Sequence, residues 1–365
     1  MPPTKTGFEA TTTEALEEEK PPMQLANPPT TITAKRKQII NLENVDYTDA
    51  ITTQPFSTLN FAPHNATLLT NYRALAHPSQ PNYIAQVVGD TILNSDEIST
   101  IAASCIVDLL EKKGISWASY NEEYPDNWIG EKPFLKEYSP NGKYVRRHTP
   151  LVSIASVQNS PERAKKIKSG EAFQKDLEAG NLPQYIYYTP NQDNNAHDTN
   201  IAYAGHYITE FLIPLLTHPH FTSRKSLFVL TFDETAFWVG KNRIATWLLG
   251  NSVKSYRGGP PSESFDTPLL QPRHRQSTAS ADDSFLGELL PPTAGEVTAK
   301  DSGTTQLVSL LASVFTKPSA EKGYIDKTKF DHYSILKTVE ENWDLGNLGR
   351  KDISAVSFEP VLRPI

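Results

Sequence analysis

Short apolar runs rich in β-branched and aromatic residues recur along the chain and predict buried strands. They lie at 38–42, 114–120, 184–188, 226–232 and 243–249. Because these runs are nearly continuous rather than alternating, they are typical of a parallel sheet that is covered on both faces. Apolar residues at helical spacing predict helices at 99–113, 200–216 and 333–343. Strands that alternate with helices predict an α/β fold with a mostly parallel central sheet and helices on both faces.

Two segments depart from this pattern. Residues 1–36 are rich in Thr, Glu and Pro, and we expect a disordered N-terminal tail there. Residues 259–322 are rich in Pro, Ser, Thr and Gly, which predicts either a disordered insertion or a retained intron. The rest of 37–365 is expected to form a single domain that this insertion interrupts.

Composition excludes some classes of function. The longest apolar stretches, such as 208–216, are too short for a membrane-spanning helix, so stable membrane insertion is not expected. The net charge is −7, and the basic pieces 35–37 and 146–147 are too short to form a nucleic-acid footprint. Cys105 is the single cysteine of the chain, so any metal would need oxygen and nitrogen ligands. The N-terminus lacks a basic and then apolar signal segment, which predicts a cytoplasmic protein.

Polar residues directly after predicted strands are the candidates for chemistry, because ligands of open α/β sheets bind at the carboxyl ends of the strands. Glu43 and Asn44 follow the first strand, 191–198 follow the third, and Asp233 and Glu234 follow the fourth. Two adjacent acids there are costly unless something positive neutralises them. One interpretation is a helix N-cap with an acid in the first turn. The other, which Glu43 and Asn44 favour, is an oxygen-rich site for a divalent metal ion.

The segment 77–83 reads His-Pro-Ser-Gln-Pro-Asn-Tyr, and its two prolines predict a rigid polar turn that presents Ser79. Such a turn can be an ordinary loop. Beside a metal ion, however, a serine hydroxyl becomes a nucleophile, because coordination favours its alkoxide.

Together these phrases resemble the fungal acid phosphatases of the phosphoesterase family, which also contains bacterial phosphatidylcholine-type phospholipases C. The likeness covers about 38–257 and 323–358. The phrases that carry it lie at 42–44, 69–72, 77–83, 108–110, 114–117, 144–150, 189–191, 197–199, 231–235, 242–243, 248–250, 332–334, 338–340 and 342–343.

The resemblance implies an alkaline-phosphatase-like α/β sandwich that hydrolyses small-molecule phosphate monoesters with the help of a divalent metal ion. Ser79 matches the nucleophile and would form a phosphoserine intermediate. The remaining site positions group by role: Glu43, Asn44, Asp233 and Glu234 as metal ligands, Asn82 and Asp198 as phosphate contacts, and His148, His197 and His332 as charge-stabilising donors or the general acid. Histidines are cationic in acid, which suits an acidic pH optimum.

Two departures from the family pattern change these expectations. Where the family usually reads Asn-Asp-Gly-His-Asp, this chain has Asn195 and Ala196 before His197, so one principal metal site is expected and a second is in doubt. The family is usually exported, whereas this chain carries no signal segment. Two other functions stay open: a phospholipase C-type phosphodiesterase, and a non-catalytic protein that keeps the fold.

Overall fold

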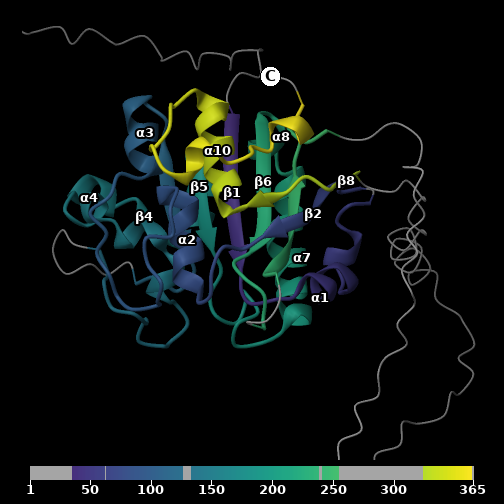
Figure 1. Cartoon of the computed structure of the whole chain (residues 1–365), viewed down its shortest axis with the longest axis horizontal. Coiled ribbons are helices and arrows are strands. Elements are labelled where there is room, and N and C mark those ends of the chain that lie inside the picture. The colour runs from purple at the N-terminus through teal and green to yellow at the C-terminus, as the bar shows by residue number, and fades with distance from the viewer. Residues whose placement is uncertain (1–34, 62, 126–132, 238–240, 255–323, 364–365) are drawn as a thin grey trace, which may run out of the picture. The chain divides into compact units, whose positions relative to one another are not determined.

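The computed structural model describes residues 35–61, 63–125, 133–237, 241–254 and 324–363 (Figure 1). The strands are β1 (Lys35–Leu42), β2 (Thr67–Arg73), β3 (Trp117–Asn121), β4 (Ile167–Ser169), β5 (Tyr185–Thr189), β6 (Lys225–Phe232), β7 (Arg243–Leu249), β8 (Tyr324–Asp326) and β9 (Phe330–Asp331). The α-helices are α1 (Tyr47–Thr52), α2 (Ser79–Val88), α3 (Ile106–Lys112), α4 (Ala155–Gln158), α5 (Pro161–Ala164), α6 (Gly170–Glu178), α7 (Ile201–Thr217), α8 (Pro219–Thr222) and α10 (His332–Trp343). Short 3₁₀ helices are η1 (Phe56–Thr58), η2 (Arg146–His148), η3 (Pro150–Ser153), η4 (Lys351–Ile353) and η5 (Glu359–Val361).

The described strands form one sheet in the order β4-β3-β5-β1-β6-β7-β2-β8, with β9 also paired to β2. All neighbours are parallel except β7, which is antiparallel to both β6 and β2. The prediction of a parallel strand at 243–249 is therefore wrong in direction. Only residues 233–242 separate β6 from β7, and a parallel return would need a crossover of about a dozen residues or more.

Helices cover both faces of the sheet, as predicted. Successive residues of a strand point to opposite faces, and Tyr187 and Tyr188 of β5 find different partners. The Tyr187 hydroxyl donates to Gln86 Oε1 of α2 over 3.1 Å, and α10 packs against α2. The Tyr188 ring stacks on Phe211 of α7, with centroids 4.4 Å apart. Figure 1 shows α2 and α10 in front of the central strands.

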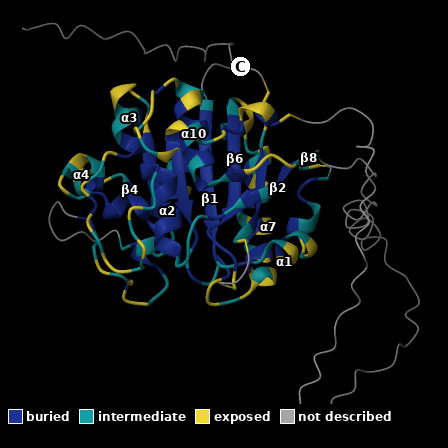
Figure 2. Ribbon diagram, viewed as in Figure 1, coloured by how far each residue is buried: buried dark blue, intermediate teal, exposed yellow. Residues whose placement is uncertain are grey.

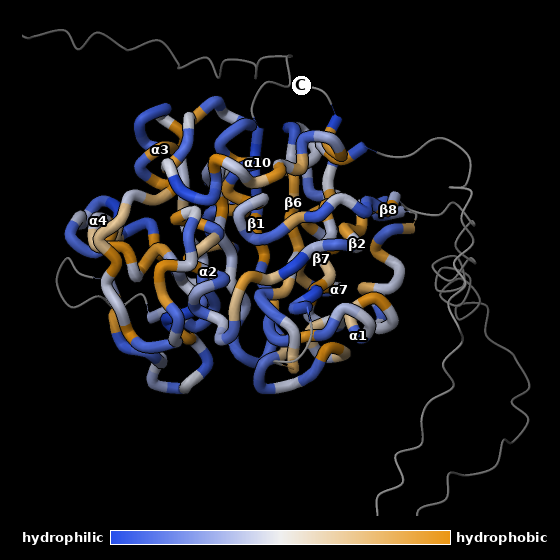
Figure 3. Tube along the Cα trace, in the orientation of Figure 1, coloured by the Kyte–Doolittle hydropathy of each residue, from blue (hydrophilic) through white to orange (hydrophobic). Residues whose placement is uncertain are grey.

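The core follows the central strands. Every described side chain of β5 is buried, and β1 and β6 are buried apart from their first residues (Figure 2). Hydrophobic positions gather along the same strands (Figure 3). No helix in the described ranges is long and apolar enough to cross a membrane. The burial of β1, β5 and β6 confirms the prediction that the continuous apolar runs are strands covered on both faces.

Some predicted bounds change. The helices expected at 200–216 and 333–343 are α7 and α10. The helix expected at 99–113 begins only at Ile106, because Ile101 forms a bridge with Ile154 and Asp108 caps the backbone N–H of Cys105 at 2.8 Å. The strand β1 begins at Lys35, inside the tail predicted for 1–36, and the rest of that tail and the insertion at 259–322 lie outside the described residues.

The predicted turn at 77–83 is the clearest difference. Only His77 and Pro78 precede the helix, Pro78 with extended backbone, and Ser79 is the first residue of helix α2. Pro81 costs little there, because the N–H groups of a first helical turn have no intrahelical acceptor. All ten residues of α2 are buried.

Candidate active site

The two acidic strand ends lie side by side. Leu42 of β1 pairs with Phe232 of β6, and the backbone N–H of Asp233 donates to the Leu42 carbonyl over 2.9 Å. Glu43 and Asp233 therefore leave neighbouring strands at the same edge of the sheet, as their positions after predicted strands indicate.

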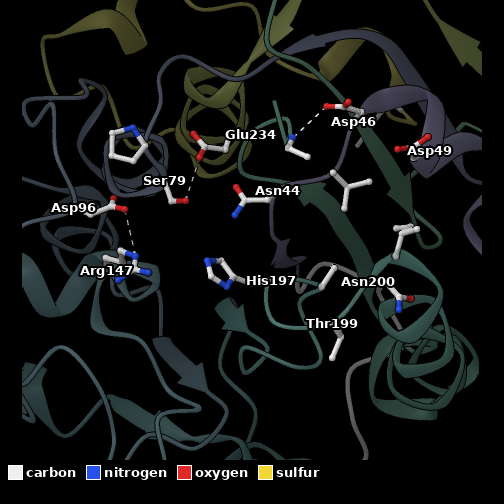
Figure 4. Close-up of a pocket in the computed structure, with 15 residues that line it drawn as sticks. Asn44, Asp46, Asp49, Ser79, Asp96, Arg147, His197, Thr199, Asn200 and Glu234 are labelled. Atoms are coloured by element: carbon white, nitrogen blue, oxygen red, sulfur yellow. Dashed lines mark hydrogen bonds and ion pairs between the residues drawn. The ribbon is translucent and has the colours of Figure 1, made fainter. Parts of the chain in front are cut away.

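Beside them lies a cavity of about 580 Å³ (Figure 4). It is lined by Asn44, Val45, Asp46, Asp49, Pro78, Ser79, Asp96, Arg147, Ala196, His197, Thr199, Asn200, Ile201, Glu234 and Ala236.

Ser79 lies between two carboxylates. Its Oγ is 3.2 Å from Glu43 Oε2 and 3.4 Å from Glu234 Oε1, and Figure 4 shows Ser79 and Glu234 pointing toward each other. As the first residue of α2, Ser79 also sits at the positive end of a helix dipole, which stabilises negative charge. The helix N-terminus therefore favours an anion at Ser79, whereas the two carboxylates oppose one unless a proton or a cation neutralises them.

Glu43 is fully buried and is held from two sides. Its Oε1 accepts a hydrogen bond from the Tyr83 hydroxyl, and His148 Nε2 lies 3.2 Å from the same oxygen. Burial, and then repulsion from Asp233, raises the pKa of the Glu43 carboxyl well above its ordinary value.

Asp233 and Glu234 are also unfavourable as anions. The Asp233 Oδ1 accepts from the Asn44 backbone N–H at 3.0 Å, whereas its buried Oδ2 has no hydrogen-bond partner among the described residues. Burial raises the pKa of Asp233, and burial followed by repulsion from Asp233 raises the pKa of Glu234 to about 9. Glu234 Oε2 lies 2.9 Å from His77 Nδ1.

These donors fit a hard divalent cation in their chemistry. Carboxylate oxygens are the ligands that such ions prefer. The unpartnered Asp233 Oδ2 and the raised pKa values of Asp233 and Glu234 show that negative charge is unfavourable here, and a bound cation would neutralise it. Within the part of the chain that the structure describes, however, no three His, Cys, Asp or Glu side chains surround a common point that could hold an ion.

Two of the three predicted catalytic histidines lie near Ser79. His148, in η2, is buried and stacks on Tyr83 with ring centroids 5.0 Å apart. Burial lowers its pKa well below the ordinary value. His197 lines the cavity, is partly exposed, and has Nδ1 2.7 Å from Asp198 Oδ1. Asp198 itself does not line the cavity and instead orients His197.

His332 does not line the cavity, as a catalytic role would require. It is fully buried at the start of α10, where Nε2 donates to the Asp233 backbone carbonyl at 2.7 Å and Nδ1 lies 3.2 Å from the Tyr72 hydroxyl. Burial lowers the pKa of His332 to about 4. The hydrogen bond from His332 holds the end of β6. The side chain stays outside the cavity, because α10 packs over the sheet and not over the cavity.

Asn82 also lies beneath the cavity rather than in its wall. Its Oδ1 accepts from the backbone N–H groups of Leu75 and Ala76, and its Nδ2 donates to Glu234 Oε2 at 3.2 Å. The amide thus holds the entry to α2 and one carboxylate, which leaves the predicted phosphate contact without support from this geometry.

Sequence reasoning missed several cavity residues. Arg147 lies in the wall, where its Nε is 3.4 Å from Asp96 Oδ2 (Figure 4). Its Nη1 is 2.6 Å from Glu137 Oε1. Its place next to His148 in a phrase already singled out could have indicated it. Asp46, Asp49 and Asp96 follow no strand directly and carry no comparable signal.

The sequence model of the Phosphoesterase family matches residues 52–240. The chain is 37% identical to an acid phosphatase of Aspergillus niger, over 90% of this chain and 63% of that protein. It is 39% identical to a phosphate-repressible acid phosphatase of Penicillium chrysogenum, over 62% of this chain and 54% of that protein. The chain thus spans less than two thirds of the length of these relatives.

Among solved structures, the soluble domain of lipooligosaccharide phosphoethanolamine transferase A from Neisseria meningitidis is similar with a TM-score of 0.44 and 9% identity. That likeness covers 93% of this chain and 96% of the other, and it concerns the fold alone. Because the family's sequence model matches more than half of the residues, the chain belongs to the phosphoesterase family.

Proposed function

We propose that this protein hydrolyses phosphate monoesters with Ser79 as the nucleophile. The observation that carries the proposal is the position of Ser79 Oγ, 3.2 Å and 3.4 Å from two carboxylates, at a helix N-terminus that lines a cavity. The names of the fungal relatives, which are acid phosphatases, support the same class of reaction.

In the first step, Ser79 Oγ attacks the phosphorus atom and loses its proton to solvent water, because Glu43 and Glu234, as the expected cation ligands, are not free to act as the base. The bond from Oγ to phosphorus forms while the bond to the leaving alcohol breaks. The leaving oxygen takes a proton from His197, whose Nδ1 is held by Asp198 and whose partly exposed ring lines the cavity. Water then hydrolyses the phosphoserine, which releases inorganic phosphate and restores the hydroxyl.

Charge in the cavity supports a metal requirement. The carboxylates of Asp46, Asp49, Asp96 and Glu234 line the cavity against two basic side chains, Arg147 and His197, so a phosphate dianion would enter an acidic cavity. A divalent cation held by Glu43, Asp233 and Glu234, with Asn44 beside them, would lower the pKa of the Ser79 hydroxyl and neutralise phosphate charge. Arg147, which also lines the cavity, would contact the phosphate oxygens.

The test is hydrolysis of p-nitrophenyl phosphate from about pH 4 to 8, with and without chelator. We expect activity on the acid side that falls with chelator and is lost in Ser79→Ala. Ser354→Ala, which removes an exposed hydroxyl that does not line the cavity, is the matched control and should keep full activity. Acid quenching with a ³²P-labelled substrate should leave label on the peptide that contains residue 79. A folded, metal-loaded wild type without turnover would contradict the proposal.

The other two functions are separate arms of this assay. Turnover of short-chain phosphatidylcholine, without turnover of the monoester, would identify a phosphodiesterase of the phospholipase C type. Metal binding without turnover of any phosphoester would identify a non-catalytic protein.

A further inference from the structure

Three lysines lie together at the amino end of the central strands, opposite the candidate active site. Lys35 and Lys37 are two residues apart on β1 and therefore point to the same face of the sheet. Lys225 of β6 pairs directly with Lys35 in the parallel register. Like charges on neighbouring strand positions repel one another, so this arrangement costs free energy unless an anion offsets it.

Lys37 is the least compensated of the three. Its side chain is only 4% exposed, and the structure gives its ammonium group no hydrogen bond or ion pair with any described residue. Lys35, in contrast, donates to the Asn342 carbonyl at the end of α10 over 2.6 Å. Burial, and then repulsion from Lys35, lowers the pKa of Lys37 to about 7.

Lys37 borders a cavity of about 260 Å³ that Lys35, Lys225, Arg363 and Asn342 also line. A second donor there lacks a partner: the side-chain Nδ2 of Asn342 is buried and makes no hydrogen bond within the described residues. Two acids border the same cavity, but both Glu341 and Glu359 are exposed, and Glu341 pairs with Lys337 at 3.6 Å. Among the described residues that line the cavity, four side chains are cationic and two are acidic, and Lys37 is the buried cation that these acids do not reach.

We infer that this cavity is a binding site for a small multivalent oxyanion of the phosphate class, held by the Lys37 ammonium and the Asn342 amide. Ammonium and amide N–H groups are the donors that phosphate oxygens accept from. The cavity has room for one such ion with some water, and among the described residues no aromatic side chain lines it to stack on a base.

The site is separate from the candidate active site. Lys37 and Glu43 are six residues apart on one extended strand, which places their backbones about 20 Å from each other. An oxyanion at Lys37 therefore cannot touch Ser79, and the inference does not rest on the proposed phosphatase activity.

Equilibrium dialysis of the full-length protein with ³²P-labelled inorganic phosphate at pH 6.5, at ionic strength held constant with NaCl, tests the site. We expect wild type to bind phosphate in a class of site that Lys37→Met weakens by at least about tenfold, as loss of one charge-assisted hydrogen bond predicts. Lys175→Met removes an exposed lysine of α6 and should bind like wild type. Turnover of p-nitrophenyl phosphate should be the same in all three proteins.

Thermal melting supplies the fold control. Without phosphate, Lys37→Met should melt at or above the wild-type temperature, because it removes a buried, repelled charge. Phosphate should raise the melting temperature of wild type by more than that of Lys37→Met. If Lys37→Met does not fold, Asn342→Ala, at the end of a helix, takes its place with the same expected loss of binding. Equal phosphate binding in wild type and these variants, or binding that NaCl alone abolishes, would overturn the inference.

Discussion

His332 Nε2 donates a hydrogen bond to the backbone carbonyl of Asp233 across 2.7 Å. A carbonyl oxygen can only accept, so the proton on this ring is assigned to Nε2 and Nδ1 is the acceptor for the Tyr72 hydroxyl. The first residue of α10 thereby fixes the end of β6, and with it the carboxylates of Asp233 and Glu234. His332 is a positioning residue for the acidic strand end.

His332→Leu should therefore destabilise the protein more than it impairs the chemistry. The variant has no side-chain donor and leaves the buried Asp233 carbonyl unpaired, which costs about 1–3 kcal/mol. We expect urea unfolding to show this loss, while kcat on p-nitrophenyl phosphate stays within about tenfold of wild type. Loss of activity as complete as in Ser79→Ala, in a variant of normal stability, would restore a catalytic role for this ring.

The same residue predicts a pH dependence of stability. The folded-state pKa of about 4 is below the ordinary value of 6.5, so between these values the unfolded chain binds a proton that the folded protein does not. The His332 contribution to stability is thus present above pH 6.5 and is lost as pH falls toward 4. Unfolding free energies of wild type minus those of His332→Leu, measured across this range, should fall with acidification. A constant difference would contradict the assignment.

Metal binding should offset the loss of stability that the buried carboxylates of Glu43, Asp233 and Glu234 cause. Without metal, Asp233→Asn should melt above wild type, because it removes a buried carboxylate whose Oδ2 is unpartnered. Adding Mg²⁺, Mn²⁺ or Zn²⁺ should raise the melting temperature of wild type but not of this variant, and chelator should undo the rise. Identical responses of the two proteins to every ion would argue against a site at Asp233.

Arg147 should matter for binding the phosphate group. Arg147→Met removes the guanidinium from the cavity wall, and we expect kcat/KM to fall by about 10²-fold, as for loss of charge-assisted hydrogen bonds to substrate. Product inhibition by inorganic phosphate should weaken in parallel, since the phosphate is the shared group. Lys165→Met, which removes an exposed cation, is the control. An unchanged inhibition constant would place Arg147 in a structural role only.

Asn195 should be replaceable by the acid that the family usually has there. The side chain is buried, with Oδ1 accepting from the His197 backbone N–H at 2.8 Å and Nδ2 donating to Gln192 at 3.0 Å. Asn195→Asp keeps the first bond, so kcat/KM should stay within about threefold. Loss of the second bond, with burial of a charge, should cost about 1–3 kcal/mol. A clear gain in activity, together with an extra metal equivalent by elemental analysis, would instead show that an acid here recruits a second ion.

Much of the sheet and part of the site could be predicted from local patterns. Continuous apolar runs located β1, β5 and β6, and acids directly after two of these runs located Glu43 and Asp233. That inference works because strand ends of a parallel sheet share one edge, so sequence position alone brings the two residues together.

Other features depend on contacts that no local pattern contains. The prolines around Ser79 favour a turn, and only burial of α2 on every side makes a helix of it. The direction of β7 follows from a short connection rather than from its apolar residues. A histidine in a family-like phrase can lie in the cavity or behind it, and for His332 the packing of α10 decides.

The burial of all ten residues of α2 has a consequence for motion. Segments that open locally are those with few buried contacts, whereas the amides of a fully enclosed helix exchange with solvent only when the whole domain opens. Ser79 is the first residue of this helix, and no flexible segment of the helix allows it to move. The parts of the site that adapt to a substrate are then the more exposed walls around His197, and the serine stays fixed while the substrate adjusts its approach.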